Sequence, residues 1–211
     1  MTSDREAVAV ALRFMSMGYH AVVLRYSVAP ARYPAALRQL AKTVALLREN
    51  SEKWHIETDK IIVSGFSAGG HLAASLGVFW NTPELKEITG FDNEMIRPDG
   101  MILNYPVITS GEFGHQESFH NLLGEKYEEL KDKMSLEYQV TEDTPKTFIW
   151  HTFEDETVLL DNTLRFVQAL YKRGIPVEYH IFPQGSHGLG LASELTANEN
   201  GRGIVRACEP W

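Results

Sequence analysis

The sequence has only one cysteine, Cys208, among 211 residues. A single cysteine excludes an internal disulfide framework and metal sites built from paired cysteines. Basic residues are also scarce, because 20 Lys and Arg stand against 28 Asp and Glu and leave a formal net charge of −8. Nucleic acids and anionic membranes attract clustered Lys and Arg, so we expect neither as a partner.

Long apolar runs are absent as well, since no stretch approaches the ~18 residues of a membrane span. The first residues, Met-Thr-Ser-Asp-Arg-Glu, lack the basic and hydrophobic regions of a signal peptide. We therefore expect a cytoplasmic protein. Internal repeats, low-complexity tracts and an evident interdomain linker are missing too. A length of 211 residues suits a single domain, residues 1–211, with a sizeable core.

The sequence does contain a G-x-S-x-G motif, Gly-Phe-Ser-Ala-Gly at residues 65–69. An apolar β-branched run precedes it and an Ala- and Leu-rich run follows, which predicts a strand, a sharp turn and a helix. In that context the turn lifts the hydroxyl of Ser67 out of the chain at the end of a sheet. We expect Gly65 and Gly69 where a side chain would collide with the closely approaching strand and helix. The flanks favour a nucleophilic serine over the alternative, a Gly-rich structural turn.

Strand-like and helix-like patterns alternate along the rest of the chain. Short apolar runs predict strands at residues 19–26, 59–64, 100–105, 147–151 and 176–182. Apolar residues at helical spacing predict a helix that Ser3 and Glu6 begin and Gly18 ends, and further helices at residues 34–50, 68–79 and 160–173. This alternation predicts an α/β fold, a mostly parallel sheet with helices on both faces.

Two stretches show weaker patterns. Residues 81–98 are polar and are predicted to be irregular. Residues 107–145 mix Gly, His, Phe and Glu with a charged helical piece near residues 126–133. We expect this second stretch to be an excursion over the active-site end of the sheet, where it could shape a substrate pocket. In parallel sheets ligands collect at the carboxyl ends of the strands.

Three candidate catalytic residues, Ser67, Asp155 and His187, each follow a different predicted strand. Parallel strands bring their carboxyl ends to the same rim, and the order Ser, Asp, His is that of an α/β-hydrolase. Neutral His187 would take the proton of Ser67 and later return it to the leaving group. Asp155 would fix the imidazole tautomer and stabilise the imidazolium.

Other residues remain candidates for the acid and the base. Asp155 is favoured among the acids because its short side chain can hold an imidazole; its rivals are Glu154, Glu156 and Asp161. His187 is favoured among the bases because it lies in a glycine-flanked loop; the alternatives are His151, His180, His115 and His120. His71 follows Ser67 by four residues, but we expect its helix to direct it away from the exposed side of the hydroxyl.

A tetrahedral intermediate also needs hydrogen-bond donors for its oxyanion. We expect the backbone N–H of Ala68, at the start of the helix after Ser67, to be one of them. The second donor normally comes from a Gly-rich loop after an earlier strand. Gly18 is the only glycine before Gly65, so the sequence contains no such loop upstream of the serine.

These segments together resemble the acetyl-esterase (xylan or carbohydrate esterase-like) group of α/β-hydrolases. The resemblance runs over nearly the whole chain. It rests on G-F-S-A-G-G-H-L-A at residues 65–73, L-R-Y-S-V-A-P at residues 24–30, His151-Thr152 with Asp155 and Val158, and G-S-H-G-L at residues 185–189. It implies a three-layer sandwich, Ser67 as nucleophile, Asp155 as acid and His187 as base. It also implies hydrolysis of short acyl esters, typically acetyl groups on sugars, with no metal or organic cofactor.

The chain departs from that group at both ends. Its members ordinarily carry a strand and a Gly-rich oxyanion loop before the segment that resembles residues 3–6, and a last helix that would begin around Trp211. We therefore expect a partial domain that lacks the N-terminal strands and the last helix. The missing strand would lie between those at residues 19–26 and 61–64, which would then pair directly or leave a gap.

The sequence is compatible with three candidate functions. The first is a serine esterase for acetyl or similar small acyl groups on a carbohydrate. The second is a peptidase or a lipase, although the sequence shows no large apolar lid and no mark of a peptide site. The third is an inactive fragment that keeps the three catalytic residues without a complete oxyanion hole. The sequence leaves a homo-oligomer open.

Overall fold

The computed structural model describes residues 5–192. The predictions for Ser3, Cys208 and the segment toward Trp211 lie outside the described residues. Within them, parallel strands form one sheet in the order β1-β2-β3-β4. The strands are β1 (Ile62–Phe66), β2 (Gly100–Asn104), β3 (Thr147–Thr152) and β4 (Val177–Phe182). Four of the predicted strands are thus confirmed, with β1 starting and ending slightly later than expected.

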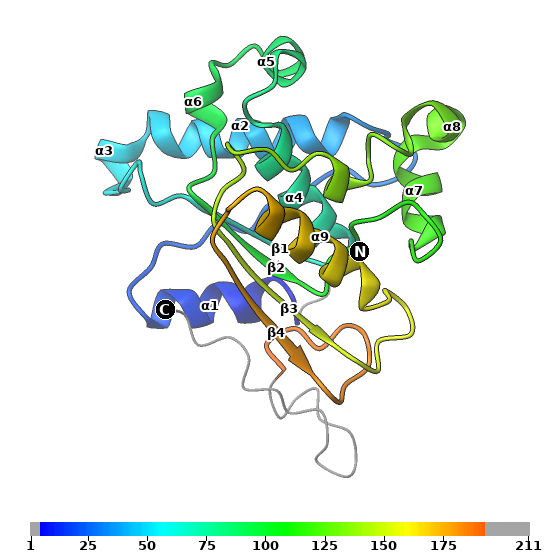
Figure 1. Cartoon of the computed structure of the whole chain (residues 1–211). Coiled ribbons are helices and arrows are strands. Elements are labelled where there is room, and N and C mark those ends of the chain that lie inside the picture. Colours follow the sequence, from blue (N-terminus) through cyan, green and yellow to red (C-terminus); the bar gives the residue numbers. More distant parts are fainter. Residues whose placement is uncertain (1–4, 193–211) are drawn as a thin grey trace.

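Most of the helices lie on one side of this sheet (Figure 1). The longer ones are α1 (Val8–Ser16), α2 (Ala35–Glu49), α4 (Ala68–Phe79) and α9 (Asp161–Lys172). Helix α4 packs on β1 and β2, α9 packs on β3 and β4, and α2 packs against α4. Helix α1 lies apart from these three, across the sheet from them (Figure 1). None of the helices in residues 5–192 is both long enough and apolar enough to cross a membrane.

The alternation of side chains along the strands builds a core on each face. Val63, Leu103 and Ile149 are buried on the face covered by α4 and α9, where the main core lies. Phe148 and Trp150 belong to a smaller cluster on the opposite face. Successive side chains of a strand point to opposite faces, so one short apolar run supplies both cores. The sheet matches the α/β architecture expected from the sequence.

The predicted strand at residues 19–26 is wrong. The structure has no strand there, and residues 19–28 run without regular secondary structure. Val22 is 60% exposed and Val23 is 41% exposed, so the apolar run is not a buried one. An extended segment becomes a strand only beside a hydrogen-bonded neighbour. In the described part of the chain, β1 pairs with β2 alone, and no ladder joins it to residues 19–26.

Two further stretches contain more helix than the sequence pattern indicated. Residues 81–98 hold α5 (Pro83–Thr89) and α6 (Asn93–Ile96), and α3 (Ser51–Trp54) follows α2. The side chain of Thr82 caps α5 by accepting a hydrogen bond from the Leu85 N–H. A threonine at this position favours the start of a helix, but the polar composition of the stretch indicated irregular structure.

The excursion at residues 107–145 packs on the helical layer. It contains α7 (Gln116–Leu123), a 3₁₀ turn η1 (Gly124–Lys126), α8 (Tyr127–Leu130) and a second 3₁₀ turn η2 (Leu136–Tyr138). Turn η2 contacts both α4 and α9. The Asn162 side chain of α9 accepts hydrogen bonds from the backbone N–H groups of Ile108 and Thr109. These contacts fix where the excursion leaves the end of β2.

Candidate active site

Ser67 occupies the turn between β1 and α4. Its φ is 52°, in the left-handed region that a residue with a side chain rarely adopts. The Ser67 N–H donates to the Asn104 carbonyl at the end of β2 (3.1 Å), which ties the turn to the neighbouring strand. A Cβ at Gly65 would lie 2.0 Å from the Gly69 carbonyl oxygen, so the turn tolerates only glycine there. This is the sharp strand-to-helix turn that exposes a serine hydroxyl.

The predicted collision of a side chain at position 69 with the strand and helix is wrong. A Cβ at Gly69 would meet only the Tyr26 hydroxyl, at an ordinary 3.5 Å. The crowded position is the next one, because a Cβ at Gly70 would lie 2.7 Å from Cβ of Pro106. The loop after β2 presses on the helix at that point. The sequence motif alone gave no indication of that contact between distant residues.

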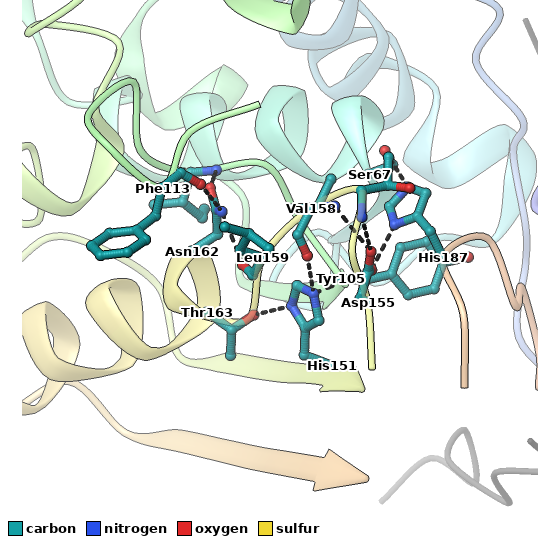
Figure 2. Close-up of polar contacts among 12 residues, drawn as sticks. Ser67, Tyr105, Phe113, His151, Asp155, Val158, Leu159, Asn162, Thr163 and His187 are labelled. Atoms are coloured by element: carbon teal, nitrogen blue, oxygen red, sulfur yellow. Dashed lines mark hydrogen bonds and ion pairs between the residues drawn. The ribbon is translucent and has the colours of Figure 1, made fainter. Parts of the chain in front are cut away.

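The imidazole of His187 joins the serine to an aspartate (Figure 2). Its Nε2 lies 2.8 Å from Oγ of Ser67, and its Nδ1 lies 2.6 Å from Oδ2 of Asp155. An ionised carboxylate only accepts hydrogen bonds, so Nδ1 carries the proton and Nε2 is free to accept the serine hydroxyl. The structure therefore brings together all three residues that the sequence singled out. In this arrangement the imidazole can remove the hydroxyl proton.

Asp155 lies in the turn after β3 and is almost fully buried. Its Oδ1 accepts the backbone N–H groups of Thr157 and Val158, at 3.0 and 2.9 Å. Burial by itself raises the pKa of the Asp155 carboxyl. The hydrogen bonds from His151, His187 and a backbone N–H outweigh that effect and hold the pKa well below its usual range. The carboxylate is therefore ionised at neutral pH and suited to orient an imidazole.

Tyr105, which the sequence pattern did not single out, supports the loop that carries His187. Its ring meets the His187 ring edge-on, with centroids 5.0 Å apart. Its hydroxyl accepts the Gly190 N–H and donates to Oε1 of Glu6, each at 2.8 Å. Its position directly after β2, at the carboxyl end of the sheet, is the signal that could have identified it. The backbone of Tyr105 also has a positive φ, 37°.

The competing acids lie elsewhere. Glu154 accepts the Gly185 N–H at 3.1 Å, and Asp161 is the first residue of α9. Asp155 is the acidic residue hydrogen-bonded to His187.

The competing histidines have other partners. His180 contacts Glu178, His115 contacts Ser118, and His120 stacks on Tyr127. His71 is buried in α4, and its Nδ1–H donates to the Val107 carbonyl at 3.1 Å. Burial lowers the pKa of His71 to about 4.

Ala68 is the first residue of α4, and its N–H therefore has no acceptor within the helix. Helix N-termini stabilise negative charge, and this one begins directly after Ser67. The position suits the predicted oxyanion donor. Within residues 5–192, no three His, Cys, Asp or Glu side chains cluster as metal ligands would.

A family model, BD-FAE, matches residues 2–170 of the chain. Two curated proteins are similar over shorter parts of their own length. Endo-1,4-beta-xylanase B of Butyrivibrio fibrisolvens is 37% identical over 204 residues, which cover 92% of this chain and 31% of that protein. An acetylxylan esterase of Xylanibacter ruminicola is 28% identical over 156 residues, 70% of this chain and 30% of that protein. The chain thus spans about a third of the length of these relatives.

Solved structures match most of the chain. An acetyl ester-xyloside bifunctional hydrolase from Caldicellulosiruptor lactoaceticus is 40% identical with a TM-score of 0.81, and the match covers 91% of this chain and 71% of that one. A carboxylesterase from Lactobacillus plantarum is 32% identical with a TM-score of 0.82, covering 93% and 72%. The sheet and its helices therefore have the arrangement found in these hydrolases.

Proposed function

Because the chain belongs to the BD-FAE family of α/β-hydrolases, we propose that it is a serine esterase that removes short acyl groups, above all acetyl, from carbohydrates. The observation that carries the proposal is the continuous relay from Ser67 through His187 to Asp155, with heavy-atom distances of 2.8 and 2.6 Å. A nucleophile, a base and an orienting acid within hydrogen-bond reach are what acyl transfer to a serine requires.

The reaction follows from this geometry. Oγ of Ser67 attacks the ester carbonyl carbon while its proton passes to Nε2 of His187. The oxyanion that forms accepts the N–H of Ala68. The C–O bond to the sugar breaks, and the imidazolium gives its proton to the departing sugar oxygen. Water then attacks the acyl-serine with His187 again as base, and releases the carboxylic acid and the free serine.

Asp155 acts on the imidazole rather than on the substrate. Its ionised carboxylate accepts the Nδ1–H of His187, which leaves Nε2 unprotonated and facing the serine. When Nε2 takes up the proton, the same carboxylate stabilises the resulting positive charge. The low pKa of Asp155 keeps this charge in place at neutral pH.

The names of the relatives support an acetylated sugar as substrate. They include an acetylxylan esterase and an acetyl ester-xyloside hydrolase. A formal net charge of −8 gives no attraction for nucleic acid or an anionic membrane. We place the sugar at the rim beside Ser67, where the excursion at residues 107–145 leaves β2.

The proposal is tested by following acetate release from p-nitrophenyl acetate and from acetylated xylo-oligosaccharides. Ser67→Ala should abolish turnover, whereas Ser64→Ala, three residues earlier on β1, should not. Longer p-nitrophenyl esters, such as the palmitate, should be poor substrates. No turnover above the Ser67→Ala level would contradict the esterase proposal for this chain. It would favour the alternative predicted from the sequence, a protein that keeps the relay but lacks a complete oxyanion hole.

A further inference from the structure

Asp155 lies between two histidines, only one of which faces the serine (Figure 2). Its Oδ2 is 2.6 Å from Nδ1 of His187 and 3.3 Å from Nε2 of His151. Its Oδ1 accepts two backbone N–H groups. A carboxylate has about four lone-pair directions, so these contacts occupy all of its accepting capacity. His151 is the side-chain partner that the proposed reaction does not use.

His151 is fully buried at the end of β3, and both of its ring nitrogens are engaged. Nε2 lies 2.7 Å from the Val158 carbonyl oxygen, and Nδ1 lies 2.8 Å from Oγ1 of Thr163 on α9. Nε2 therefore faces two oxygens that can only accept, the Val158 carbonyl and the Asp155 carboxylate. The proton of a neutral imidazole must lie on Nε2, and Nδ1 must accept the Thr163 hydroxyl.

These contacts hold the turn that presents Asp155 at two points. The Val158 N–H donates to Asp155, while the Val158 carbonyl accepts from His151. The side chain of His151 is in turn fixed by Thr163, in the first turn of α9. The chain of contacts runs from α9 through His151 to the turn and its carboxylate.

We propose that His151 is a positioning residue whose Nε2–H holds the Asp155 turn so that Oδ2 points at His187. It has no route to the substrate, because it is buried and both of its nitrogens are occupied. It acts through Asp155. This inference rests on the proposed function in one respect, that the relay is the catalytic one.

The first test compares His151→Leu with His151→Gln in steady-state ester hydrolysis. Leucine keeps the bulk of the side chain without a donor, whereas the Nε2 of glutamine is the same number of bonds from Cα as Nε2 of histidine. We expect His151→Leu to lower kcat roughly tenfold with little change in KM, because a hydrogen bond to a charged group is lost. His151→Gln should recover most of that loss.

His180→Leu is the matched control. His180 lies on the neighbouring strand β4, is exposed and contacts Glu178 away from the relay. Its substitution should leave kcat unchanged. Equal rates for His151→Leu and the wild type, or equal losses for the leucine and glutamine variants at 151, would overturn the positioning role.

The second test changes the support of His151 and leaves its ring in place. Thr163→Val removes the hydroxyl bonded to Nδ1, while Thr163→Ser keeps it and removes only a methyl group. We expect the valine variant to lose a few-fold in kcat and the serine variant to lose less. The opposite order would show that packing, and not the hydrogen bond, is what Thr163 supplies. This pair decides the question even where His151→Leu does not fold.

The third test is independent of turnover. In ¹⁵N NMR of the resting wild-type protein, Nε2 of His151 should carry a proton. The low-field Nδ1–H proton of His187, hydrogen-bonded to Asp155, should be visible in the wild type and His151→Gln and weakened in His151→Leu. A His151 ring without a proton on Nε2 would refute the inference. An inactive protein with the expected spectra would refute the proposed esterase function and leave the inference on His151 intact.

Discussion

Residues 5–192 cover the two faces of the sheet to different extents. Leu103 and Ile149 are fully buried on the face under α4 and α9, whereas Ile62 on the opposite face is 44% exposed. The opposite face relies on a small cluster that includes Phe148, Trp150 and Leu189. Close packing on one face holds the residues at the end of the sheet in fixed positions. A face with fewer packed side chains holds them through fewer contacts.

The members of the relay are divided between these two faces. Ser67 leads into α4, and Asp155 is held through His151 and Thr163 of α9, so both depend on the helix-covered face. The loop of His187 packs on the opposite cluster through Leu189 and Tyr105. Within residues 5–192, the loop of the base therefore packs on the smaller of the two core clusters. Substitutions can test this division directly.

The largest effect is expected on the helix-covered side, at Asp155. Asp155→Asn keeps the shape but cannot hold the Nδ1–H tautomer of His187, and the equivalent change costs about 10⁴-fold in kcat in a serine protease triad. We expect a loss of this order in ester hydrolysis. Glu156→Gln, one residue away, is the matched control. Similar losses in the two variants would show that the carboxylate of Asp155 has no special role.

The second effect compares the two faces in stability. Leu103→Ala should lower the free energy of unfolding by about 2–5 kcal/mol, because it leaves a cavity in the main core. Ile62→Ala on the opposite face should cost less than about 1 kcal/mol, since the side chain is partly exposed already. Urea denaturation measures both. Equal costs would mean that the two faces are packed alike.

The third effect lies on the thinly covered side. Tyr105→Phe removes the hydroxyl that accepts the Gly190 N–H and donates to Glu6. We expect kcat to fall roughly fivefold, the equivalent of about 1 kcal/mol, because the loop that carries His187 loses an anchor. Tyr138→Phe serves as the control, because the side chain of Tyr138 is exposed. An unchanged kcat in Tyr105→Phe would place the support of the loop elsewhere.

The smallest effect is the pH dependence of stability. The folded pKa of Asp155 is lowered relative to that of an unfolded carboxyl, about 3.9. Its contribution to stability is therefore fully present above that value and is lost as the pH falls below it. Thermal unfolding between about pH 2 and pH 5 should show a steeper acid-side loss for the wild type than for Asp155→Asn. Parallel curves would contradict the lowered pKa.

The sequence was most informative where the residues that form a structure are neighbours in the chain. The run before Ser67, the G-x-S-x-G turn and the helix after it are neighbours in the chain, and their local preferences agree with the fold. The parallel strands then bring His187 to the serine from 120 residues away. The order of the strand ends indicated that the three residues lie at one rim, while other acids and histidines stayed open as alternatives.

The sequence was least informative where structure depends on distant neighbours. Residues 19–26 have the composition of a strand, but β1 makes no ladder with them. The contact of Gly70 with Pro106 and the support that Tyr105 gives to Gly190 join segments far apart in the chain. His151 precedes Asp155 by only four residues, but the sequence pattern does not show which contact the two side chains make. Such contacts become apparent only once the strands are placed side by side.

The most direct test of the central claim is covalent trapping of Ser67. The wild-type protein is incubated with an organophosphate that phosphorylates activated serines, and the intact mass and the modified peptide are then measured. The relay predicts one adduct, located on Ser67, that is absent in Ser67→Ala and much slower to form in Asp155→Asn. An unmodified protein, or an adduct that persists in Ser67→Ala, would contradict the assignment of Ser67 as the nucleophile.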